Sequence, residues 1–110
     1  VIILKHAKEQ RPELYVEFRT TLIPGVNDSS EVIESITKEI AFADKYALQQ
    51  YMAGPTLNDP SMEKIGDLPK FRLIELAEVA SQHVKNVVLR TREDGEQPFE
   101  ANVLATTQQL

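Results

Sequence analysis

Apolar and polar positions along this chain follow two different periods. Over residues 15–23 the period is two, which predicts a strand with one buried face. The runs 45–53 and 86–91 are also rich in apolar residues, and we expect strands there. Elsewhere apolar residues recur every three or four positions, which predicts helices over 1–11, from about 28 to 44, and from about 69 to 84. On the last helix we expect a buried face made of Leu73, Leu76, Ala77, Ala80 and Val84.

Turn and capping residues mark the ends of these elements. Pro24 and Gly25 end the first strand, and Asp28 follows them with Glu31 three positions later. This spacing is a capping-box pattern, so we expect Asp28 to cap the second helix. Residues 54–69 carry Gly, Pro, Asn and Asp at short intervals, which predicts a long loop, and long loops in compact domains are often functional.

The order helix, strand, helix, strand, helix, strand predicts an α/β fold. Such alternation is typical of a parallel sheet whose strands are joined by helical crossovers. We expect a parallel sheet of about three strands in a single domain over residues 1–110. The tail, residues 92–110, has no pattern that assigns its structure.

Composition excludes several classes of function. The net charge is -5 and the pI is about 5.0, which argues against a broad nucleic-acid or anionic-membrane surface. With no cysteine, the chain cannot hold a thiolate-bound iron–sulfur cluster, a zinc–thiolate site or a thiol nucleophile. No signal peptide or spanning segment is visible, so the cytoplasm is the default compartment. The chain begins with Val1 inside an apolar run, and we expect a fragment or a processed product.

Polar residues gather near the carboxyl ends of the predicted strands, the edge where parallel α/β proteins bind ligands. Gln49 and Gln50 either bind a polar ligand, or one faces solvent while the other bonds a neighbouring strand. Arg19 either neutralises a ligand carboxylate or pairs with Glu17 or a neighbouring strand. No pair of carboxylates stands out as a general acid and base, and with two histidines a histidine-rich metal site is not expected. We therefore predict no catalytic residue and no metal ligand.

The segments "YVEFRTTLIPGVND", "YALQQYMAGPTLND" and "VKNVVLRT", in this order, resemble the C-terminal half of radical S-adenosylmethionine enzymes. The resemblance is greatest to the glycyl-radical activases, especially the activating proteins of anaerobic ribonucleoside-triphosphate reductases, and it covers roughly residues 1–91. It implies a partial, half TIM-like barrel of βα units. The family's CxxxCxxC motif, which holds a [4Fe-4S] cluster, lies in the N-terminal half and is absent here.

The resemblance also implies a cofactor site. Ile23 and Gly25 match an apolar residue and a glycine that contact the adenine of S-adenosylmethionine. The segment Gln49, Gln50, Tyr51 and Met52 matches residues that flank the adenine, although activases often have His or Arg at the position of Met52. We expect these six residues to line one shallow concave site, with weak affinity for the cofactor in this chain alone.

The implied function is the C-terminal part of an activase. The cluster of the other half would form a 5'-deoxyadenosyl radical from S-adenosylmethionine, and that radical would abstract hydrogen from a glycine of a partner protein. This chain would supply one wall of the pocket and part of the partner surface, and it would be inactive alone. The alternatives are a non-catalytic α/β binding or interaction module, and half of another TIM-like enzyme with a phosphate- or sugar-directed site. Because three strands cannot close a barrel, we expect open sheet edges to pair with the missing half or with a second copy, giving a homo-oligomer.

Overall fold

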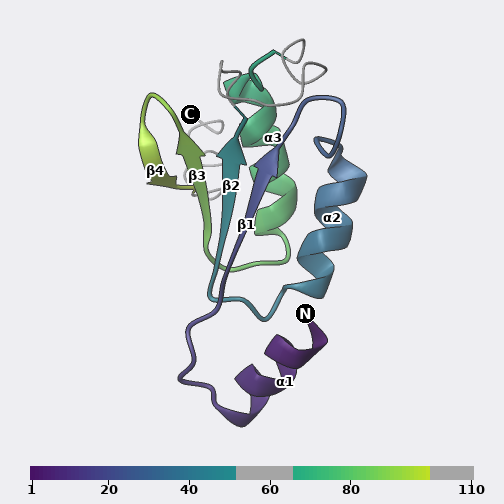
Figure 1. Cartoon of the computed structure of the whole chain (residues 1–110), viewed down its shortest axis with the longest axis vertical. Coiled ribbons are helices and arrows are strands. Elements are labelled where there is room, and N and C mark those ends of the chain that lie inside the picture. The colour runs from purple at the N-terminus through teal and green to yellow at the C-terminus, as the bar shows by residue number, and fades with distance from the viewer. Residues whose placement is uncertain (52–65, 100–110) are drawn as a thin grey trace, which may run out of the picture.

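The computed structural model describes residues 1–51 and 66–99, and Figure 1 shows their arrangement. Within these residues the chain forms helices and strands in alternation. In chain order they are α1 (Ile2–Gln10), β1 (Glu17–Leu22), α2 (Ser30–Glu39), β2 (Lys45–Gln50), α3 (Lys70–Ser81), β3 (Val87–Thr91) and β4 (Gly95–Pro98).

The sheet has the strand order β1-β2-β3-β4. The first three strands are parallel, so the prediction of an α/β fold with parallel βα units is confirmed. The expected count of three strands is wrong, because β4 forms within the unassigned tail and pairs antiparallel with β3. We had expected the outer edge of β3 to be open, but β4 covers it. Its partner strand follows a tight turn in which Gly95 has a φ of +66°, a conformation that favours glycine.

The hydrophobic core lies between the sheet and two helices. Alternate residues of the three parallel strands meet apolar residues of α2 and α3, and Figure 1 shows both helices on the same side of the sheet. The buried members of this cluster are Leu22, Ile33, Ile40, Tyr46, Leu48, Leu68, Leu73, Leu76, Ala77, Ala80, Val84, Val87 and Leu89. All five residues expected on the buried face of the third helix segment are among them, with Val84 just beyond the end of α3. The buried faces of these strands and helices therefore follow from the periodic pattern of apolar residues.

The cap of α2 differs from the sequence prediction by one residue. The hydroxyl of Ser29, not the carboxylate of Asp28, accepts the N–H of Val32, at 3.2 Å. Asp28 instead accepts the N–H of Gly25 at 3.0 Å and so closes the preceding turn. The helix also ends at Glu39 rather than near residue 44.

We expect Ser29→Ala to lower the free energy of unfolding by about 1 kcal/mol, since the helix loses its N-cap acceptor. Ser30→Ala is the matched control, because the Ser30 hydroxyl has no hydrogen-bond partner among the described residues. Urea denaturation of the two variants checks this. Equal stabilities of the two would contradict the assignment of the cap.

Asp44 joins α1 and the start of β1 to the sheet. Its carboxylate accepts the N–H of Val16 at 2.8 Å and binds the Lys8 ammonium at 2.9 Å. The hydrogen bond from Val16, followed by that from Lys8, lowers the pKa of Asp44 from its ordinary value of 3.8. Lys8 also donates to the carbonyl oxygens of Pro12 and Leu14, so a single side chain ties together the segment between α1 and β1.

The lowered pKa of Asp44 predicts a pH dependence of stability. Because the folded-state pKa is below 3.8, the contribution of Asp44 is present above that pH and is lost as the pH falls through the folded-state pKa. We expect Asp44→Asn to be less stable than the unmodified chain at neutral pH, with a difference that shrinks below pH 3.8. Denaturation at a series of pH values measures this, with Glu9→Gln on the exposed side of α1 as control. A difference that does not change with pH would refute the role given to Asp44.

Candidate functional site

The carboxyl ends of β1, β2 and β3 lie at the same edge of the sheet, at the top of Figure 1. Leu22 pairs with Gln50 across β1 and β2, and Gln49 pairs with Arg90 across β2 and β3. The structure therefore places the end of "EFRTTL" directly beside the end of "KYALQQ". In parallel α/β folds this edge carries the ligand site, so it is the candidate functional site here.

The turn after β1 is held by its own side chains. The N–H of Ile23 donates to Asn27 Oδ1 at 2.8 Å, and Asn27 Nδ2 donates to the carbonyl of Thr21 at 3.0 Å. Gly25 has a φ of +79°, and a side chain there would be strained by the backbone conformation although the space around it is open. Two of the backbone donors at the predicted adenine position are thus bonded within the turn. Asn27 was not singled out from the sequence, although Asn after Pro-Gly is a recognisable turn signal.

The end of β2 places its two glutamines differently. Gln50 Nε2 donates to the carbonyl of Leu68, just before α3, at 2.7 Å, so its partner is neither a ligand nor a neighbouring strand. The side chain of Gln49 has no hydrogen-bond partner within residues 1–51 and 66–99. Tyr51 is buried, and its carbonyl accepts the N–H of Leu68 at 3.2 Å. Met52, the last residue of the predicted site, lies outside the described residues.

A cavity of about 300 Å³ opens at this edge, on the side of β3 and β4. Its lining residues are Gln49, Gln50, Arg90, Thr91, Arg92 and Gly95. Ile23 and Gly25 are not among them, and they lie in the turn on the opposite side of β2. The predicted site residues therefore share one edge of the sheet but divide between this cavity and the turn after β1.

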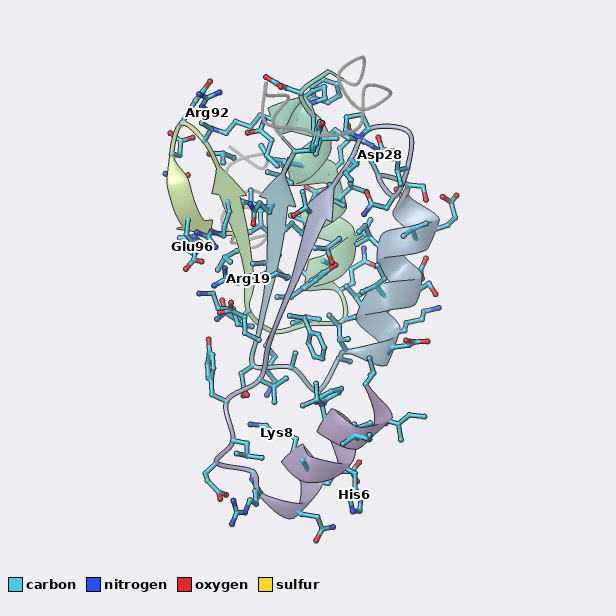
Figure 2. The ribbon with its side chains drawn as sticks, viewed as in Figure 1. His6, Lys8, Arg19, Asp28, Arg92 and Glu96 are labelled. Carbon is cyan, nitrogen blue, oxygen red and sulfur yellow. The ribbon has the colours of Figure 1, made fainter. Side chains whose placement is uncertain are left out.

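The sheet face opposite the helices carries a chain of charged residues that crosses all four strands. Arg19 Nε lies 2.5 Å from Glu17 Oε2, and Lys45 Nζ lies 3.5 Å from Glu17 Oε1. Lys45 also lies 2.7 Å from Glu96 Oε2, and Arg90 Nε lies 4.0 Å from Glu96 Oε1. Figure 2 shows Arg19 and Glu96 near one another on this face. The face is polar, in contrast to the apolar face beneath α2 and α3.

The same contacts set the ionisation of this face. The Arg19 hydrogen bond is the main cause that lowers the pKa of Glu17, and Glu96 is the main cause that raises the pKa of Lys45. The interpretation of Arg19 as an ion-pair partner of Glu17 is therefore the one that the structure bears out. An anionic or zwitterionic ligand at this face would therefore meet paired acidic and basic side chains.

Neither a metal centre nor a membrane segment is found in the part of the chain that the structure describes. No group of three or more His, Asp or Glu side chains there is arranged to hold a metal ion. No helix among these residues combines the length and apolar character needed to cross a bilayer.

The chain is similar to a protein from Methanocaldococcus jannaschii that is named a putative glycyl-radical enzyme activating enzyme. The two are 34% identical over 82 residues, which is 74% of this chain and 33% of the relative. The chain thus spans about a third of the length of the relative that it matches. No protein-family model and no solved structure matches the chain. The match relates this chain to an activating enzyme of glycyl-radical enzymes, the class that the strand-end motifs had indicated.

Proposed function

We propose that this chain is the C-terminal part of a radical S-adenosylmethionine activase of the type that activates anaerobic ribonucleoside-triphosphate reductases. The observation that carries the proposal is the 34% identity, over 74% of the chain, to an activating enzyme about three times as long as the matched segment. The parallel β1-β2-β3 arrangement and the polar strand ends support it, since a partial barrel would place its cofactor at this edge.

Some residues at this edge of the sheet are suited to bind the adenine ring of S-adenosylmethionine. Ile23 is half-buried at the end of β1 and offers an apolar surface to a flat adenine ring. The bond from the Ile23 N–H to Asn27 fixes the backbone at this position, which helps to preorganise the turn. Tyr51, at the adjacent strand end, would complete this wall from the β2 side.

The iron–sulfur cluster must come from another part of the enzyme, because this chain has no cysteine. When bound there, the cluster would reductively cleave the cofactor and generate the species that takes hydrogen from a glycine of the partner protein. The role of this chain is to position the adenosine and to exclude water from one side of the pocket. Arg19 and Lys45 lie on the face that would line the barrel interior, but they pair with Glu17 toward the amino ends of the strands, away from the edge proposed for the cofactor.

A chimaera tests the proposal. This chain would replace the matched segment of the Methanocaldococcus jannaschii relative, and the product would be reconstituted anaerobically with iron and sulfide. We expect reductive release of 5'-deoxyadenosine from S-adenosylmethionine, at a rate similar to that of the unaltered relative. A matched control replaces the same segment with this chain carrying Leu48→Ala, which disrupts the core. A well-folded chimaera with an intact cluster spectrum and no release of 5'-deoxyadenosine would contradict the proposal.

We also propose that the isolated chain self-associates through β1. This strand is at the edge of the sheet and pairs only with β2 among the described elements, so its outer backbone groups can pair with another chain. We expect light scattering to show a dimer or larger species at micromolar concentration. Thr21→Pro, at an exposed position on β1, should shift the chain toward the monomer, while Thr21→Ala, which keeps the backbone N–H, should not. A stable monomer across the whole concentration range would contradict this.

A further inference from the structure

Two arginines lie beside one cavity, at the carboxyl ends of β2 and β3. Arg90 and Arg92 line it together with Gln49, Thr91 and Gly95, and its volume is about 300 Å³. Figure 2 shows Arg92 at the tip of the hairpin formed by β3 and β4, with Glu96 further along β4. The chain as a whole has a net charge of -5, so two neighbouring guanidinium groups at one cavity are a local exception.

Two carboxylates near this cavity, those of Asp94 and Glu96, are paired with lysines. Asp94 Oδ2 lies 2.6 Å from Lys70 Nζ, and this hydrogen bond is the main cause that raises the pKa of Lys70. Glu96 Oε2 lies 2.7 Å from Lys45 Nζ. Arg90 is left with a distance of 4.0 Å to the other oxygen of Glu96, which is too long for a hydrogen bond.

Two further polar side chains line the cavity, those of Arg92 and Gln49. Neither the guanidinium of Arg92 nor the side-chain amide of Gln49 has a hydrogen-bond or ion-pair partner in the described part of the chain. The Arg90 side chain is 37% exposed, and its backbone position is fixed by pairing with Gln49 and Glu96 in the sheet. The hairpin tip is fixed as well, because Thr91 Oγ1 accepts the N–H of Asp94 at 3.0 Å and Lys70 holds Asp94 from α3.

We propose that this cavity binds the phosphate group of a small ligand. A guanidinium presents its N–H donors in a planar fork that matches two oxygens of a phosphate, and two such groups match its double negative charge better than that of a single carboxylate. Arg90 and Arg92 would supply the forks, and the amide of Gln49 would donate a further hydrogen bond. S-adenosylmethionine carries no phosphate, so this site goes beyond the proposed cofactor pocket and does not depend on it.

The test is a titration of the isotopically labelled chain with inorganic phosphate, at an ionic strength kept constant with chloride. We expect saturable shifts of the backbone amide signals of Gln49, Arg90, Arg92 and Gly95. Arg92→Gln, on the exposed turn, should weaken binding about tenfold or more, since a hydrogen bond to a charged group is lost. Arg90→Lys should also weaken it, because the charge stays but the fork is lost. Arg11→Gln is the matched control: it removes the same charge at the C-cap of α1, a helix that lies at the opposite end of the molecule from the β3–β4 turn in Figure 1, and should change nothing.

The probes also separate the source of the phosphate. Tighter binding of ADP than of inorganic phosphate, lost in Arg92→Gln, would identify a nucleotide as the ligand, while equal binding would identify free phosphate. Acetate that binds as well as phosphate would overturn the choice of ligand. Shifts that do not saturate, or that are the same in Arg92→Gln and Arg11→Gln, would overturn the site. None of these outcomes requires cofactor cleavage, so they are independent of the chimaera experiment.

Discussion

Replacing Leu48 by alanine is expected to lower the free energy of unfolding by about 2 to 5 kcal/mol. Leu48 is fully buried in the middle of β2, where it pairs with Thr20 of β1 and Leu89 of β3 and packs in the cluster beneath the helices. Truncation removes apolar contact and leaves a cavity that the neighbouring strands cannot close. Since a domain of this size has a total stability of about 5 to 15 kcal/mol, the variant would lose a large share of it. Urea denaturation followed by circular dichroism measures the loss.

The control for this variant is Ile2→Ala on α1. Ile2 is 85% exposed, so its truncation should change the free energy of unfolding by no more than about 0.5 kcal/mol. If Leu48→Ala were as mild as Ile2→Ala, the central position of β2 between β1 and β3 would be wrong.

Ile23→Asp is expected to weaken binding of S-adenosylmethionine about tenfold or more in the chimaera, because a charge would replace the apolar wall against the adenine. The same change should leave the cluster spectrum unaltered, since this chain contributes no cluster ligand. Equilibrium titration with the cofactor gives the dissociation constants. The test is possible in the chimaera because the isolated chain should bind the cofactor only weakly.

Two further variants separate a binding effect from a folding effect. Ile23→Leu keeps an apolar side chain and should bind nearly as well as the unmodified chimaera. Asp28→Ala removes the acceptor for the Gly25 N–H and loosens the turn without touching the proposed wall. Affinity that falls in Asp28→Ala as far as in Ile23→Asp would show that turn stability, not adenine contact, controls binding.

The parallel part of the fold could be predicted because its signal is local and periodic. The strict alternation around Phe18 and Leu22 and the helical spacing of Leu73, Leu76 and Ala80 each determine which face is buried, whatever lies elsewhere in the chain. Parallel pairing then follows from the helix between each pair of strands. Whether the sheet is half of a barrel depends on further strands, and the pattern of this chain does not determine that.

The fourth strand was missed although its turn is visible in the sequence. Asp94-Gly95 between "VVLRT" and "EQPF" is a hairpin signal, but the strand that follows has exposed, polar side chains and no apolar alternation. What holds it in place is tertiary: Glu96 binds Lys45, and Phe99 packs against the core. Contacts of this kind join residues far apart in the chain and leave no periodic trace.

At the candidate site, the sequence predicted the shared edge better than it predicted the partners of each side chain. Ser29 and Asp28 are both good cap residues, and their roles depend on where the turn at Gly25 places each oxygen. Gln50 finds its partner at Leu68, beyond the long loop, which no local pattern could indicate. Arg90 and Arg92 gain their significance only when β4 brings lysine-bound carboxylates beside them.

If this chain is part of a longer, cluster-bearing activase, the coding DNA upstream of Val1 will encode the cluster ligands. We expect an open reading frame continuous with this chain that encodes CxxxCxxC within about 150 residues before Val1, roughly one domain length. Sequencing that region gives the answer without any question of folding or reconstitution. An upstream reading frame without that motif would contradict the claim and would favour a non-catalytic α/β binding module.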